Sequence, residues 1–381
     1  MPVLSKSESN HSSISAPSSS AARVIGIPLP ADSDPLHKRA RPGRLIDAHT
    51  LRLVQFPSDN LVPPYAILSH RWLEGQEVSY WEMLQIFIDE MHPSRSKAGF
   101  QKIVNACAQA LKDGHTFIWT DTCCIDDGDH AQKSQDINSM YNYYSNAEVC
   151  YVFLSDFPWP RNPSQDIHIS ESVWFSRGWT LQEFVAPSRI KFFTADWEHY
   201  RIDRYDLVPW GIIASKTGIP TEVLAGERRV EDIGIKERMS WSINRETTKE
   251  EDQAYCLLGL LGVTMELRYG EGAESAFAHL SRLLYEQYPD QMVEFLGLGK
   301  VGDGKAIMNI LRDTNRTVCD TTRREWMRID KNLDMARAES HCQLNPSFGI
   351  HSRTGRGRRP NGSTFGRRRV GHLRERERVL F

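Results

Sequence analysis

The stretch that decides the fold begins with residues 65–72, which read YAILSHRW. A short apolar run that ends in polar residues is typical of a buried strand that stops at a loop. Two more runs of this kind follow, TFIWTDTCCI at 116–125 and VCYVFL at 149–154. Because β-branched and aromatic residues favour strands, we expect three buried strands here.

Helices are predicted between these strands. The capping-box pattern Ser79-x-x-Glu82 opens an amphipathic segment that ends at Pro93. Apolar residues recur at helical spacing over 100–111 and again over 137–144. Alternating helices and continuously apolar strands indicate an α/β domain, in which a parallel sheet carries helices on both faces.

Four regions are expected along the chain. Residues 1–42 hold nine serines in the first twenty positions and show no apolar periodicity, which predicts a disordered N-terminus. Residues 43–200 are assigned to the α/β domain. Residues 201–300 carry mostly helical patterns and are predicted to extend it, and residues 301–381 are predicted to be a low-order basic tail.

The composition excludes several classes of protein. A length of 381 residues favours two or three folding units. With 40% hydrophobic and 25% charged residues, the chain is neither wholly disordered, nor a coiled coil, nor a collagen-like fibre. The net charge of −2 is unevenly spread, because residues 351–381 contain ten arginines and two glutamates. An acidic globule of charge −10 therefore carries a basic tail of charge +8.

The sequence predicts a cytoplasmic protein without a membrane partner. The Arg-rich tail is a candidate nuclear localisation signal. The longest apolar run, residues 256–263, is far shorter than the roughly 20 residues of a membrane helix. The first residues lack the apolar core of a secretory signal. Seven cysteines without a C-x-x-C spacing indicate neither a disulfide framework nor a zinc ribbon.

A polar rim is expected where the strands end, because ligands of open parallel sheets bind at the carboxyl ends of the strands. The rim mixes a cation, carboxylates and aromatic side chains, which suits a polar ligand. Ordinary loop residues, which are polar in most proteins, are the alternative explanation. The rim residues are Ser69, His70, Arg71 and Trp72 after the first strand, Asp121 and Asp126 around the end of the second, and Ser155 and Asp156 after the third.

Four motifs together resemble the fungal heterokaryon incompatibility (HET) domain: YAILSHRW at 65–72, WTDTCCID at 119–126, INSMY at 137–141 and WFSRGWTLQE at 174–183. Further matches extend the resemblance over roughly residues 43–295. The resemblance implies a death effector of fungal nonself recognition, and a distant similarity to TIR domains with their flavodoxin-like, three-layer α/β fold.

The TIR similarity nominates a catalytic residue. WTLQEFV at 179–185 resembles a run in plant TIR domains whose glutamate cleaves NAD, which points to Glu183. A carboxylate near the ribose would stabilise the positive charge that develops as nicotinamide leaves. Trp72 or Trp179 would stack on a flat ring and Arg71 would meet a phosphate. NAD is then a substrate, and no cofactor is required. Alternatively, Glu183 simply pairs with a nearby arginine.

Other motifs carry less weight. The glycines of 297–302 fit G-x-G-x-x-G, but the βαβ context of a nucleotide site is missing. Cys123 and Cys124 lie in an apolar run that suits neither a reactive thiolate nor a metal site. A Ser69–His70–Asp relay fails because adjacent strand residues point to opposite faces. The acidic residues around 246–252, beside Arg245 and Lys249, are interpreted as a solvated face.

Two classes of function stay open. In the first, the protein is an enzyme that consumes NAD or a related small nucleotide. In the second, it is a non-catalytic module that self-associates and recruits other death components. In both cases the expected partners are other copies of the chain and a separate sensor protein. Binding of nucleic acid through the tail is a weaker alternative.

Overall fold

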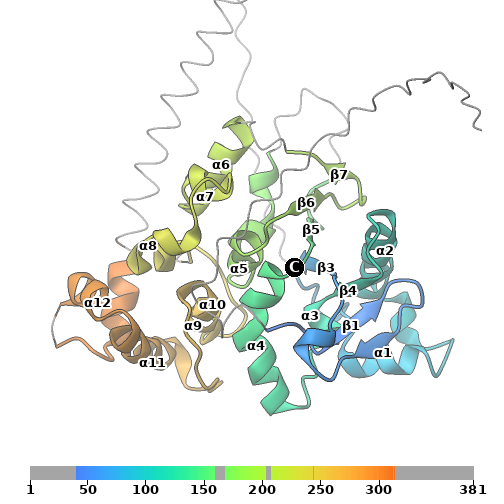
Figure 1. Ribbon diagram of the computed structural model, residues 1–381, viewed down its shortest axis with the longest axis horizontal. Helices are drawn as coiled ribbons and strands as arrows, with labels where there is room; N and C mark the ends of the chain where they lie inside the picture. Colours follow the sequence, from blue (N-terminus) through green and yellow to red (C-terminus); the bar gives the residue numbers. More distant parts are fainter. Residues whose placement is uncertain are drawn as a thin grey trace, which may run out of the picture. The chain divides into compact units, whose positions relative to one another are not determined.

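Figure 1 shows the computed structural model, which describes residues 40–158, 168–202, 207–242, 244–297, 299–311 and 313. The Ser-rich region predicted to be disordered lies outside these residues except for its last three positions. The Arg-rich tail lies outside them entirely. Within these ranges no helix is both long enough and apolar enough to cross a membrane.

The sheet has seven strands in the order β2-β1-β4-β3-β5-β6-β7. Its centre, β4-β3-β5-β6, is parallel, and an antiparallel strand or hairpin is added at each edge. The strands are β1 (Arg44–Asp47), β2 (Leu53–Gln55), β3 (Ala66–His70), β4 (Phe117–Trp119), β5 (Val149–Phe153), β6 (Ile190–Phe193) and β7 (His199–Tyr200).

The strand order explains why helices cover both faces. The chain runs from β3 to its neighbour on one side, β4, and then across to β5 on the other side. Right-handed crossovers in opposite directions place their helices on opposite faces. Figure 1 accordingly draws α2 (Ala98–Lys112) on one side of the sheet, and α4 (His130–Ser145) and α5 (Thr180–Val185) on the other. The predicted α/β class is confirmed.

The core lies around the two central strands. Every residue of β3 and β5 is buried, as their continuous apolar sequences predict. Large aromatic side chains fill the space between the sheet and α4, with Trp119 meeting Tyr143 and Tyr144 edge to face. Such contacts stabilise a pair by about 0.5–1.5 kcal/mol beyond simple burial.

Two strand predictions need correction. The run at 116–125 forms a strand only over β4, and its second half becomes the short helix α3 (Asp121–Cys124). The sheet is also mixed rather than wholly parallel, because β1, β2 and β7 pair antiparallel with their neighbours. The sequence analysis did not predict these three strands. These edge strands have only two to four residues, too few for a periodicity to register.

A mostly helical region follows the sheet, as predicted. Its apolar residues join those of the α/β domain in one core cluster. Residues 304–311 are also helical, with Ile307 and Leu311 buried, so the predicted start of the tail at residue 301 is too early. The helices of this region are α6 (Leu207–Thr217), α7 (Thr221–Leu224), α8 (Ile235–Ser240), α9 (Asp252–Tyr255), α10 (Leu258–Leu261), α11 (Gly272–Gln287) and α12 (Pro289–Leu296).

Shorter elements complete the described chain. Helix α1 (Tyr80–Ile86) begins at Ser79, whose side chain forms the expected capping box with Glu82. Single 3₁₀ turns connect the longer elements at η2 (Asp59–Leu61), η3 (Pro93–Ser96), η4 (Ile169–Glu171), η5 (Val173–Ser176) and η6 (Val230–Asp232).

The contact between α10 and α4 gives a test of the packing. A Cβ on Gly259 would lie 2.1 Å from the Cβ of Tyr141. Gly259→Ala should therefore force the helices apart and lower the free energy of unfolding by about 1–3 kcal/mol. Urea denaturation measures this change. Gly43→Ala, at a glycine with nothing within 4 Å of the added atom, is the control; equal midpoints for the two variants would contradict the packing.

Candidate functional site

Glu183 lies at the carboxyl end of the central strand β3. Its side chain, on the first turn of α5, accepts a hydrogen bond of 2.6 Å from the hydroxyl of Ser69. The Ser69 oxygen in turn accepts a bond of 2.9 Å from the indole nitrogen of Trp174. Glu183 is only 4% exposed. The glutamate and the LSHRW run therefore meet at Ser69, in the protein interior.

Burial favours the protonated form of Glu183, although its hydrogen bonds with Ser69 and Tyr144 oppose this shift. Burial raises the pKa of Glu183 to about 8, and the nearby charge of Asp121 adds to the effect. The Tyr144 hydroxyl also contacts Glu183, and it donates a bond of 3.0 Å to the carbonyl of Leu68. A protonated Glu183 can donate to Tyr144 while it accepts from Ser69, so each group in the chain is satisfied. At neutral pH Glu183 is a neutral acid.

A second cluster gathers around His70. The ring nitrogens of His70 lie 2.6 Å from the amine of Lys102 and 3.0 Å from the carboxylate of Asp121. Asp121 also accepts a bond of 2.7 Å from the indole of Trp72. Burial opposes the charge of Asp121, but His70, Trp72 and Lys102 outweigh it and hold the pKa of Asp121 below its ordinary value.

These two clusters lie on opposite faces of the sheet. Ser69 points toward α5, and His70, the next residue of the strand, points toward α2, where Lys102 lies. This confirms that a Ser69–His70 relay cannot form. The predicted rim is thus divided: Ser69 meets Glu183 on one face, while His70, Trp72 and Asp121 meet on the other.

Several predicted site residues lie apart from both clusters. Arg71 is exposed. Asp126 accepts a bond of 2.9 Å from the backbone nitrogen of Gly128 within a turn. Trp179 hydrogen-bonds Asp252 in the helical region rather than facing Glu183.

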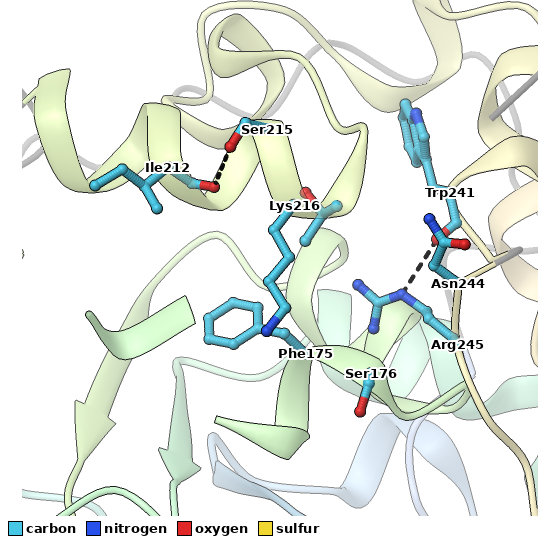
Figure 2. Close-up of a pocket in the computed structure, with 9 residues that line it drawn as sticks. Phe175, Ser176, Ile212, Ser215, Lys216, Trp241, Asn244 and Arg245 are labelled. Carbon is cyan, nitrogen blue, oxygen red and sulfur yellow. Dashed lines mark hydrogen bonds between the residues drawn. The ribbon is translucent and has the colours of Figure 1, made fainter. Parts of the chain in front are cut away.

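Arg245 connects the Glu183 cluster to a pocket. It lies close enough to Glu183 to act on its charge. Its guanidinium donates to the carbonyls of Trp241 and Arg177 and to the hydroxyl of Thr180. The pocket has a volume of about 410 Å³ and is drawn in Figure 2. Its lining residues are Phe175, Ser176, Ile212, Ser215, Lys216, Thr217, Trp241, Asn244 and Arg245.

The sequence analysis did not predict this pocket. It interpreted the acidic residues beside Arg245 as a solvated face. Arg245, Glu251 and Asp252 are all buried. Glu251 accepts bonds of 2.6 and 3.0 Å from the backbone nitrogens of Gly270 and Gly272. The motif RETT at 245–248, one of the further matches that extend the family resemblance over residues 43–295, was an available signal.

The described cysteines are free and buried, as expected. Burial raises the pKa of Cys107 and Cys256 to about 12, so both remain thiols at neutral pH. Cys123 hydrogen-bonds Cys124, which raises the pKa of Cys123 as burial does. A thiolate nucleophile is not available at these positions.

Comparison with known proteins identifies the family. Residues 65–158, from β3 to just after β5, match the family described as "Heterokaryon incompatibility protein (HET)". The chain contains a HET domain. It is also 40% identical over 241 residues to the "Vegetative incompatibility protein HET-E-1" of the fungus Podospora anserina. That match covers 61% of this chain and 17% of the relative. No solved structure matches the chain.

The raised pKa of Glu183 predicts a pH-dependent stability. Between its ordinary value of 4.5 and about 8, Glu183 keeps its proton in the folded HET domain and loses it in the unfolded chain. Rising pH therefore destabilises the fold, by up to about 1.4 kcal/mol per pH unit from this group. Glu183→Gln lacks this titration. The free energy of unfolding of Glu183→Gln, relative to that of the wild type, should therefore increase from pH 5 to pH 8.

Urea denaturation at pH 5, 6.5 and 8 measures the difference. Glu148→Gln, which changes an exposed glutamate, is the matched control and should follow the wild type throughout. If Glu183→Gln also runs parallel to the wild type, Glu183 is ionised in the folded protein and Tyr144 donates its hydrogen bond to Glu183.

Proposed function

We propose that this HET-domain protein is an effector of heterokaryon incompatibility in a fungus, and that it acts in the cytoplasm. The family match over residues 65–158 and the 40% identity to a vegetative incompatibility protein support this role. The chain spans about a sixth of that relative's length. A separate sensor protein, together with self-association of this chain, is the proposed trigger of the effector.

The proposed activity is hydrolysis of the nicotinamide–ribose bond of NAD, with Glu183 as the catalytic residue. The observation that carries it is the position of Glu183, a buried carboxyl with a raised pKa at the carboxyl end of the strand where the sheet order reverses. Ligands of open α/β sheets bind at such a point, and strongly shifted pKa values concentrate at functional sites.

The reaction balances without a cofactor. The bond between C1′ of the ribose and the nicotinamide nitrogen breaks, and its electron pair stays on the nitrogen. Water adds to C1′ and releases a proton, which yields ADP-ribose and nicotinamide. An ionised Glu183 would stabilise the cationic sugar between these events.

The site must open before it can act. Glu183 is covered by its hydrogen-bond partners Ser69 and Tyr144, and Trp174 in turn hydrogen-bonds Ser69. A substrate has to displace at least one of these side chains. Assembly of several copies is the proposed cause of the opening. The HET domain is therefore inactive as a dilute monomer.

Release of nicotinamide from NAD tests the activity. The full chain, clustered by fusion to a domain that dimerises on adding a small molecule, should release nicotinamide only when clustered. Glu183→Gln should lower the rate by at least about 100-fold. Because the ionised form is needed, the rate should rise with pH and reach half of its maximum near pH 8. Glu148→Gln is the matched control and should keep the wild-type rate.

Equal rates for Glu183→Gln and the wild type would remove Glu183 from catalysis. No release from a folded and clustered wild type would reject the enzymatic proposal and leave the effector role to assembly alone.

A second candidate function, non-catalytic self-association, is favoured by exposed apolar side chains around α1. Trp81, Ile88 and Met91 are 58%, 77% and 87% exposed, which is unusual for large apolar residues close together in the chain. If these residues mediate assembly, Ile88→Asp with Met91→Asp should abolish concentration-dependent sedimentation of the full chain. Val301→Asp, at another exposed apolar residue, is the control. Unchanged sedimentation of the double variant would exclude this surface.

A further inference from the structure

The pocket beside Glu183 has the features of an anion site. Its volume of about 410 Å³ is within the range of small-molecule sites. Two cationic side chains line it, Lys216 from α6 and Arg245 from the loop after α8, and none of its described lining residues is acidic. In Figure 2 the Lys216 side chain runs down to end beside Phe175, and the guanidinium of Arg245 lies to the right of it.

Arg245 lacks a counter-charge in this structure. It is only 8% exposed, and its Nη2 nitrogen has no hydrogen-bond partner among the described residues. Its other nitrogens bond to neutral oxygens. The two acids that act on its charge, Glu183 and Cys256, have pKa values raised by burial to about 8 and about 12, so both are neutral at pH 7. A buried, uncompensated guanidinium is costly.

A second unpartnered donor lines the same pocket. Trp241 is 1% exposed, and its indole nitrogen has no partner in the described part of the chain. An indole N–H only donates, as do guanidinium and ammonium groups. Lys216 is exposed at the pocket wall and uses one of its donors on the carbonyl of Ser170. Two buried donors without a hydrogen-bond partner therefore belong to residues that line this pocket, together with the ammonium group of Lys216.

We propose that this pocket binds the phosphate group of a small phosphorylated molecule, with Arg245 as the buried donor and Lys216 as the second cation. A phosphate has several acceptor oxygens and up to two negative charges, which matches two cations better than a carboxylate does. Arg and Lys bound to one phosphate form charge-assisted hydrogen bonds, the stronger class in proteins. The proposal does not rest on NAD hydrolysis, since it requires no chemistry at Glu183.

Calorimetric titration of the full chain with inorganic pyrophosphate tests the proposal. The wild type should bind with saturation, and added salt should weaken the binding. Lys216→Met keeps the length of the side chain and removes its charge, so affinity should fall about tenfold or more. Lys112→Met is the matched control, because Lys112 is an exposed lysine at the end of α2 that does not line the pocket. It should bind as the wild type does.

The variants also separate the pocket from the Arg-rich tail. Anions held by the arginines beyond residue 351 would bind equally well to Lys216→Met and to Lys112→Met, and that result would overturn the proposal. Failure of the folded wild type to bind pyrophosphate would overturn it as well. A second titration with ADP identifies the source of the phosphate. If ADP binds more tightly than pyrophosphate does, the rest of the pocket recognises a nucleoside. If the two bind equally, the pocket recognises the phosphates alone.

Discussion

The hydrogen bond from Ser69 to Glu183 is the constraint on which the rest of the site depends. It joins Ser69, near the end of the central strand β3, to Glu183 on helix α5, which lies 114 residues later in the chain. Trp174 and Tyr144 extend it on either side, so loss of one member leaves another buried polar group unsatisfied. The register of β3 is held in the same way, because a slip of one residue would place either His70 against Glu183 or Ser69 against Lys102, depending on its direction.

The centre of the fold could be predicted from the sequence, and its edges could not. Continuous apolar runs identified β3 and β5, and helical periodicity identified α2 and α4, since these elements are long enough for a pattern to repeat. The run TDTCC has the composition of a strand but forms α3. There Asp121 accepts from the backbone nitrogen of Thr122 and from Trp72, contacts that no local propensity contains.

The candidate site was only partly predictable, because burial of charged residues is hard to infer from spacing. Charged side chains are rarely buried, so a cluster of them is ordinarily interpreted as solvent-exposed. Glu251 contradicts that expectation because its partners, the backbone nitrogens of Gly270 and Gly272, lie 19 and 21 residues away. Glu183 was found through the family resemblance, and its burial and its partner Ser69 became apparent only in three dimensions.

Arg245 links the two proposed activities through its charge. At neutral pH it faces a protonated Glu183 on one side and an open pocket on the other. An anion bound in the pocket would compensate this charge and so remove the stabilisation that Arg245 offers an ionised Glu183. The reverse follows by thermodynamic linkage, since an ionised Glu183 weakens the attraction of the pocket for an anion. A phosphorylated ligand in this pocket would therefore hold Glu183 in its neutral form, which is the form that cannot stabilise a cationic sugar.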